Sequence, residues 1–157
     1  MKVNLLLDNP KTLNGYLNID PFLKEAGTSR IKSDVFNLDE YIDNAECEEI
    51  RASEILCYVN SNLVDDVISN WIKKIRINGT LVISEIDFVK VYSAYEEGLI
   101  DLTEANILLY GNQEKFWDFK KCIFTLDYMN NFLIQKELKI IEKYYEDAFT
   151  FTIKAKR

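Results

Sequence analysis

Three carboxylates stand at the ends of candidate strands. Asp8 and Asp20 close short apolar runs that begin at Val3 and Tyr16, and Glu54 follows a candidate strand at residues 49–53. An apolar run that stops at polar, turn-forming residues is typical of a buried strand that leads into a loop. At such a strand end a carboxylate accepts hydrogen bonds from hydroxyl groups, or acts as a base where burial raises its pKa.

Histidine is absent from the 157 residues, which removes the side chain that most often acts as a general base near neutral pH. Proton transfer must then use Asp, Glu, Lys, Tyr or Cys, and serine–histidine or cysteine–histidine hydrolysis is excluded. The three cysteines, Cys47, Cys57 and Cys122, have no CxxC spacing. We therefore expect no structural metal site and expect each cysteine to be a small, partly buried apolar residue.

The composition is that of one globular domain, and we assign residues 1–157 to a single unit. The formal charge of −7 argues against a nucleic-acid backbone as the partner. No apolar run is long enough to cross a membrane, and the first nine residues do not resemble a secretion signal, so a cytoplasmic protein is expected.

The candidate residues must be held in place by helices and strands. The sequence pattern alternates strands with helices. Strands are expected near residues 2–7, 16–20, 49–53 and 80–84, with a weaker one at 31–36. Residues 62–76 have the apolar spacing of a helix that stops at Asn78-Gly79. Residues 86–109 look mainly helical, residues 110–121 read as a surface loop, and Thr125 is expected to cap a helix through residue 136.

The last segment alternates apolar and polar residues over 139–145 and 148–156. This pattern predicts an antiparallel hairpin with a two-residue turn at Glu146-Asp147. The whole order predicts an α/β fold with a mostly parallel sheet, helices on both faces and a C-terminal antiparallel edge.

Several blocks in this order resemble a compact S-adenosylmethionine-dependent methyltransferase family found among glycan-modification and phage genes. Residues 15–20 (GYLNID) are similar to the family's GY-NVD, and residues 48–56 (EEIRASEIL) to its DEIYASHVLEH. Residues 71–84 resemble W-RVLKPGGTLVIS, residues 109–113 and 119–124 resemble YGGQ and FHKSGF, and Ser33-Asp34-Val35 with Leu38 resembles ADV…DL. The resemblance implies a Rossmann-like class I methyltransferase fold.

The same resemblance implies a cofactor site made from Leu6, Asp8, Asp20, Asp34 and Ser53. The family's glycine motif LGCG is replaced here by Leu6-Leu7-Asp8. Leucine at the first glycine position fills space that a close cofactor needs, and Asp8 places a negative charge near the methionine carboxylate. Both changes oppose ordinary binding.

Two of these acidic residues have alternative interpretations. The resemblance implies that Asp20 binds the ribose hydroxyls and that Asp34 lies near the adenine edge. Asp20 also precedes Pro21, so it is equally consistent with a cap, and Asp34 is consistent with a plain loop residue.

The catalytic candidates are Glu54 and Tyr58, which replace two family histidines. Glu54 is a candidate base for deprotonating a hydroxyl, and its alternative is a carboxylate at a helix start. Trp117 and Lys120 are candidates for the wall of an acceptor site; alternatively, their loop only packs over the sheet.

Two functions remain open from the sequence. The first is methyl transfer to a small molecule or glycan, which depends mainly on alignment and does not require a histidine. The second is a non-catalytic binding or oligomerisation module, a pseudoenzyme that has lost cofactor binding and forms a homo-oligomer through an apolar surface.

Overall fold

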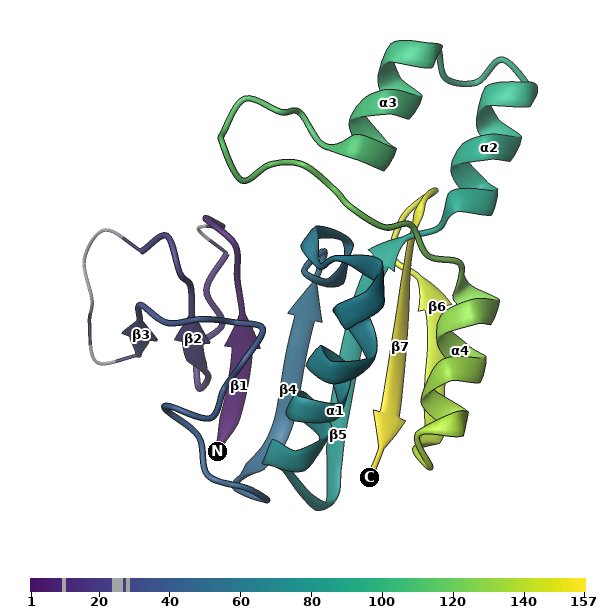
Figure 1. The fold of residues 1–157 in the computed structure, drawn as a ribbon. Helices are drawn as coiled ribbons and strands as arrows, with labels where there is room; N and C mark the ends of the chain where they lie inside the picture. The colour runs from purple at the N-terminus through teal and green to yellow at the C-terminus, as the bar shows by residue number, and fades with distance from the viewer. Residues whose placement is uncertain (10, 24–26, 28) are drawn as a thin grey trace.

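The computed structural model describes residues 1–9, 11–23, 27 and 29–157. In this part of the chain seven strands form one sheet in the order β3-β2-β1-β4-β5-β7-β6 (Figure 1). Strands β1 to β5 pair in parallel, and β7 pairs antiparallel with both β5 and β6. The strands are β1 Lys2–Leu5, β2 Leu17–Ile19, β3 Arg30–Ile31, β4 Cys47–Ser53, β5 Ile75–Ile86, β6 Lys139–Tyr145 and β7 Thr150–Lys156.

The helices of the described residues follow β4 and β5. They are α1 Val64–Lys74, α2 Phe88–Glu96, α3 Leu102–Tyr110 and α4 Leu126–Gln135, with short 3-10 turns at Leu56–Tyr58 and Ser61–Leu63. Asp65 and Asp66 begin α1 and Lys73 and Lys74 end it, which complements the helix dipole. Thr125 caps α4 as expected, because its side chain accepts a hydrogen bond from the Tyr128 amide.

One face of the sheet holds the apolar core. Successive side chains of a strand point to opposite faces, so Ile50, Ile83 and Ile153 share a side and are fully buried there. Trp71 of α1 and Met129 of α4 belong to the same buried cluster. The Trp71 indole N–H donates to the Val35 carbonyl at 2.8 Å, which satisfies its polar atom within the core.

The other face of the sheet is polar, and this differs from the expectation of helices on both faces. Both α1 and α4 lie on the core side (Figure 1). The opposite side carries Asn4, Arg51 and Lys154. The described residues between β1 and β4 form turns and short strands rather than helices, so no helix of these residues covers the second face. The α/β class, the mostly parallel sheet and the antiparallel edge are confirmed.

Some element boundaries differ from the sequence predictions. The third strand is only Arg30–Ile31, and the turn between β6 and β7 takes four residues, 146–149. Asp147 replaces the glycine of a tight turn, because its Oδ1 accepts the amides of Phe149 and Thr150. Asn78-Gly79 does not separate α1 from β5 but lies inside β5. A Cβ at Gly79 would approach the Cys47 carbonyl oxygen to 2.9 Å, so only glycine fits there.

Candidate functional site

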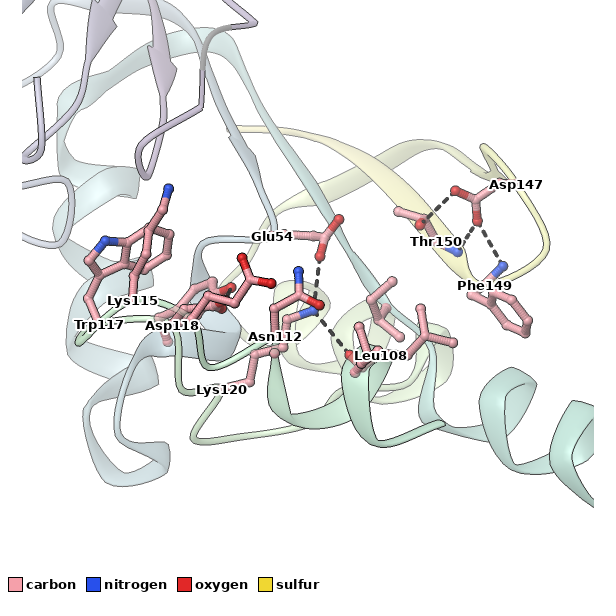
Figure 2. Close-up of a pocket in the computed structure, with 15 residues that line it drawn as sticks. Glu54, Leu108, Asn112, Lys115, Trp117, Asp118, Lys120, Asp147, Phe149 and Thr150 are labelled. Atoms are coloured by element: carbon pink, nitrogen blue, oxygen red, sulfur yellow. Dashed lines mark hydrogen bonds and ion pairs between the residues drawn. The ribbon is translucent and has the colours of Figure 1, made fainter. Parts of the chain in front are cut away.

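A crevice runs along the carboxyl ends of the parallel strands, where the loops after β1, β2 and β4 meet the loop at residues 111–121. It contains three neighbouring cavities. The loop cavity, of about 460 Å³, is bounded by Glu54, Lys120 and Phe149 (Figure 2). The sheet cavity, of about 430 Å³, lies over Asn4, Leu6 and Arg51. The aromatic cavity, of about 380 Å³, is lined by Leu7, Phe22, Phe36, Tyr58, Phe116, Trp117, Phe119 and Lys121.

The loop after β1 is organised by Asp20, which is almost fully buried. Its Oδ1 accepts the Asp8 amide at 3.0 Å and the Phe22 amide at 2.9 Å. Asp8 has a φ of 50°, which is the left-handed region that glycine favours. Asp20 therefore fixes the backbone at the position where the family has its glycine motif.

Asp8 does not stand as an isolated negative charge, because Lys115 of the 111–121 loop forms an ion pair with it. Leu6 is buried and Leu7 half-buried, and both line the sheet cavity rather than closing it. The ion pair therefore balances the negative charge of Asp8, which the sequence suggested would oppose cofactor binding at this loop.

Glu54, a catalytic candidate, and Lys120, a candidate for the acceptor wall, bind each other. The Lys120 ammonium donates to Glu54 Oε2 at 2.9 Å and to the Leu108 carbonyl at 3.1 Å (Figure 2). Lys120 is nearly buried, whereas the Glu54 side chain is 44% exposed to the cavity. This ion pair holds the Glu54 side chain at the edge of the loop cavity.

Tyr58 is bound to the same loop, because its hydroxyl donates to Asp118 Oδ1 at 2.9 Å. Burial, and then the Asp118 carboxylate, raise the pKa of Tyr58 well above its usual value. Tyr58 therefore stays protonated and acts as a hydrogen-bond donor. Asp118 packs tightly against Gly111, where a Cβ would lie 2.6 Å from Asp118 Oδ1, so this loop conformation requires glycine.

Aromatic rings close the far side of the crevice. Trp117 stacks on Phe22 with ring centroids 4.9 Å apart, and it meets Tyr58 edge-on at 5.5 Å. The Lys115 ammonium lies over the Trp117 ring at 5.3 Å. These contacts connect the 111–121 loop to the loops after β2 and β4.

The structure brings most of the candidate residues to this crevice. Leu6, Ser53, Glu54, Tyr58 and Trp117 line the sheet cavity, and Lys120 lines the loop cavity. Asp8 and Asp20 line none of the three cavities, but Asp20 holds the loop after β1 by accepting the Asp8 amide. Asp34 lines none of the three cavities, and its Oδ1 accepts the Phe36 amide at 2.8 Å.

Sequence reasoning missed Lys115, Asp118 and Phe22. Lys115 forms an ion pair with Asp8, and Asp118 accepts a hydrogen bond from Tyr58, but the partners lie 107 and 60 residues apart in the sequence. The sequence signal for these residues was the charged and aromatic composition of the segment at residues 110–121. Among the described residues no cluster of potential metal ligands is found, and none of their helices is long and apolar enough to span a membrane.

Comparison with known proteins gives structural relatives only. No family model matches the sequence, and no curated protein matches it. A methyltransferase from Mesorhizobium loti superposes with a TM-score of 0.60 at 16% identity over 90% of this chain and 80% of its own. A Burkholderia thailandensis N1-methyltransferase, with 1,6-didemethyltoxoflavin and S-adenosylhomocysteine bound, gives 0.59 at 10% identity over 91% of this chain and 62% of its own.

An O-methyltransferase family 2 protein from Planctomyces limnophilus, in complex with apigenin, gives a TM-score of 0.54 at 12% identity. This chain spans only 35% of that protein, although the match covers 82% of this chain. At such identities the likeness concerns the fold. Together with the strand order, it shows that this protein has the class I S-adenosylmethionine-dependent methyltransferase fold.

Proposed function

We propose that this protein is an S-adenosylmethionine-dependent methyltransferase that acts on a small molecule or sugar. The observation that carries the proposal is the continuity of the crevice. The aromatic and sheet cavities share Leu7, Tyr58 and Trp117. The sheet and loop cavities share Glu54, Tyr58, Trp117, Asp147 and Thr150. Ligands of α/β folds bind outside the carboxyl ends of the strands, which is where these cavities lie.

The residues present fit an adenosyl cofactor. Phe22, Phe36 and Trp117 offer flat apolar surfaces for a purine ring. Asp20 uses one carboxylate oxygen for backbone amides, and its other oxygen is assigned to the ribose hydroxyls. Lys115 neutralises Asp8, so the charge nearest the expected methionine carboxylate is balanced. Ser53 and Leu6 complete the wall, and Asp34 is left as a loop residue.

The bound cofactor supplies an electrophilic methyl group. The protein contributes alignment, because the cavities join where Tyr58 and Trp117 lie. Glu54 is the proposed acceptor of the proton that a substrate hydroxyl releases, and the Lys120 ammonium holds its side chain at the edge of the cavity. Tyr58, whose phenol stays protonated, positions the loop through Asp118 rather than acting as a base.

Calorimetric titration with S-adenosylmethionine and S-adenosylhomocysteine tests the cofactor site. We expect micromolar binding by the wild type and at least tenfold weaker binding by Asp20→Asn, which keeps an oxygen for the Asp8 and Phe22 amides. The matched control is Asp127→Asn, an aspartate in the first turn of α4. If neither ligand binds the wild-type protein, the proposed activity is wrong.

A second candidate, the non-catalytic binding or oligomerisation module, is favoured by one surface. Helices α2 and α3 stand beyond the end of the sheet (Figure 1), and they and their connection expose large apolar side chains. These are Val89, Tyr92, Tyr95, Leu99, Leu102, Ile107 and Tyr110. Sedimentation equilibrium tests this candidate: we expect a dimer that Leu99→Lys with Leu102→Lys converts to monomer. A wild-type monomer at all concentrations contradicts it.

A further inference from the structure

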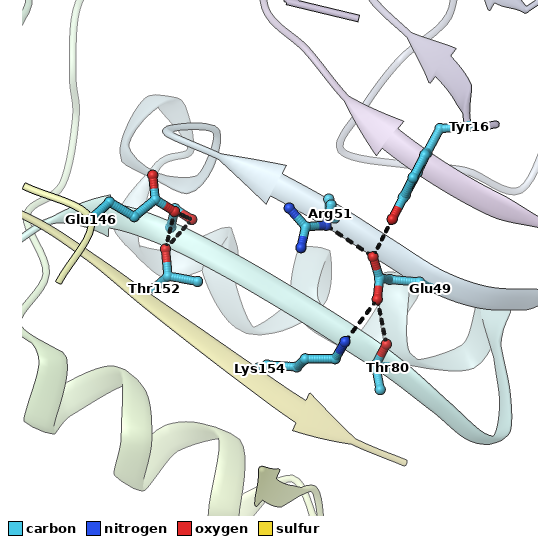
Figure 3. Close-up of polar contacts among 8 residues, drawn as sticks. Tyr16, Glu49, Arg51, Thr80, Glu146, Thr152 and Lys154 are labelled. Carbon is cyan, nitrogen blue, oxygen red and sulfur yellow. Dashed lines mark hydrogen bonds and ion pairs between the residues drawn. The ribbon is translucent and has the colours of Figure 1, made fainter. Parts of the chain in front are cut away.

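The polar face of the sheet carries a tightly organised charge cluster around Glu49 (Figure 3). Glu49 accepts from Arg51 Nε at 2.9 Å, Thr80 Oγ1 at 3.0 Å and Lys154 Nζ at 3.1 Å, and also from the Tyr16 hydroxyl. Its side chain is 10% exposed. These contacts come from β4, β5, β7 and the segment before β2, so four parts of the chain fix one carboxylate.

The cluster carries a net positive charge. One carboxylate, Glu49, faces two cations, Arg51 and Lys154, in a chain whose overall charge is strongly negative. Arg51 uses only Nε toward Glu49, and among the described residues its two terminal nitrogens have no protein acceptor. Figure 3 shows these nitrogens turned away from Glu49 and toward the side where Glu146 lies.

Arg51 lines the sheet cavity together with Asn4 and Lys11. Glu146 also lines it, on the side toward which the terminal nitrogens of Arg51 point (Figure 3), and its Oε1 accepts from Ser84 at 3.1 Å and from Thr152. The cavity therefore has a basic end and an end with carboxylate and hydroxyl groups. Such a lining fits a small molecule with an anionic group at one end and hydrogen-bond donors at the other.

We propose that Arg51 recognises the acceptor through an anionic group, a carboxylate or a phosphate, whose hydroxyl-bearing part faces Glu146. The inference rests on the proposed function and names its substrate class as small organic anions with hydroxyl groups. The planar guanidinium presents two parallel donors, which match two oxygens of either anion. Glu49 is a positioning residue, because it holds Arg51 in that orientation before the ligand arrives.

Titration followed by amide nuclear magnetic resonance shifts tests this site with three probes: glucuronate, glucose 6-phosphate and neutral glucose. We expect at least one anionic probe to bind ten or more times more tightly than glucose, with shifts at Arg51 and its strand neighbours. Binding of glucuronate alone indicates a carboxylate ligand, and binding of glucose 6-phosphate alone indicates a phosphate ligand. Either result supports the proposal.

Two variants separate recognition from folding. Arg51→Gln is expected to weaken binding of the anionic probe at least tenfold. Arg51→Lys is expected to retain part of the affinity, because lysine keeps the positive charge but lacks the two parallel donors of the guanidinium. The matched control is Arg76→Gln, which removes an exposed arginine of β5 that pairs with Glu48. Thermal unfolding of each variant confirms that it is folded.

The inference is overturned if no anionic probe binds, if glucose binds equally well, or if folded Arg51→Gln binds the anions as tightly as the wild type does. Titration of the same samples with S-adenosylhomocysteine keeps this failure distinct from failure of the proposed function. If the cofactor binds and the anions do not, only the proposed substrate class is wrong. If the cofactor does not bind, the proposed methyltransferase activity is wrong.

Discussion

Glu85 is a buried carboxyl group of β5 that faces the core side of the sheet. Its Oε1 accepts the amides of Ile55 and Leu56 at 3.0 and 2.7 Å, and its Oε2 is buried without a partner among the described residues. Burial raises the pKa of Glu85 to about 7. The folded state therefore binds this proton more tightly than the unfolded chain does.

Stability linked to Glu85 is present below the ordinary carboxyl pKa and is lost as the pH rises through 7. We expect this group to lower the free energy of unfolding by roughly 2 kcal/mol between pH 5 and 8. Glu85→Gln keeps an oxygen for both amides and should remove that pH dependence in urea unfolding. Glu96→Gln on the exposed face of α2 is the control, and equal slopes for all three proteins contradict the assignment.

Glu49 has the opposite dependence. Burial by itself raises its pKa, but the hydrogen bonds from Tyr16, Arg51, Lys154 and Thr80 outweigh burial and lower it to about 2. The stabilisation is present above the ordinary carboxyl pKa and disappears as the pH falls toward 2. We expect Glu49→Gln to cost about 2–3 kcal/mol at pH 7 and nothing near pH 2.

Chemical denaturation at pH 7 and at low pH measures the effect of Glu49→Gln. The neighbouring Glu48 is a suitable comparison, because its carboxylate pairs with Arg76 on the surface. Glu48→Gln is expected to change stability by less than about 0.5 kcal/mol. A similar loss for the two variants at pH 7 would show that the cluster does not stabilise the sheet.

At the scale of elements, Asp87 connects three parts of the chain. Its Oδ1 caps α2 through the Val89 amide, and its Oδ2 accepts from the Leu126 amide of α4 and the Tyr145 hydroxyl of β6. Asp101 caps α3 through an exposed capping box with Glu104. Both residues therefore cap a helix, but Asp87 is buried and Asp101 is exposed.

We expect Asp87→Ala to cost about 3 kcal/mol and Asp101→Ala about 1 kcal/mol, because the first also removes the acceptor of the Leu126 amide and of the Tyr145 hydroxyl. Thermal or urea unfolding of the pair measures the difference. Equal losses would mean that Asp87 acts only as a helix cap.

Sequence patterns predicted those elements whose formation depends on interactions between residues close together in the chain. Helix α1, the Thr125 cap and strand β5 follow from apolar spacing and capping chemistry. The Asp8–Lys115 and Glu54–Lys120 pairs were not predicted, because each joins residues that the fold alone brings together. The strand side of the crevice and the loop residues Trp117 and Lys120 were therefore among the predicted positions, whereas the ion pairs that join the loop to the strand ends were not.

Across the whole molecule, protection against hydrogen exchange should follow the sheet. Strand β5 is bonded on both edges, by β4 and β7, and its core-facing side chains are buried. Helices α2 and α3 pack on each other beyond the end of the sheet. We expect the slowest amide exchange in β5 and its two neighbours, and clearly faster exchange in α2 and α3. Mass spectrometry of exchanged peptides measures both, and equal protection in α2 and β5 contradicts this order.

The one-sided core has an evolutionary consequence. Because α1 and α4 pack on a single face, substitutions at Asn4, Arg51, Thr152 and other positions on the polar face change few core contacts. New side chains on that face can alter which molecules bind without first breaking the fold. A random library restricted to the polar face should therefore contain many more folded members than one of equal size restricted to the core face.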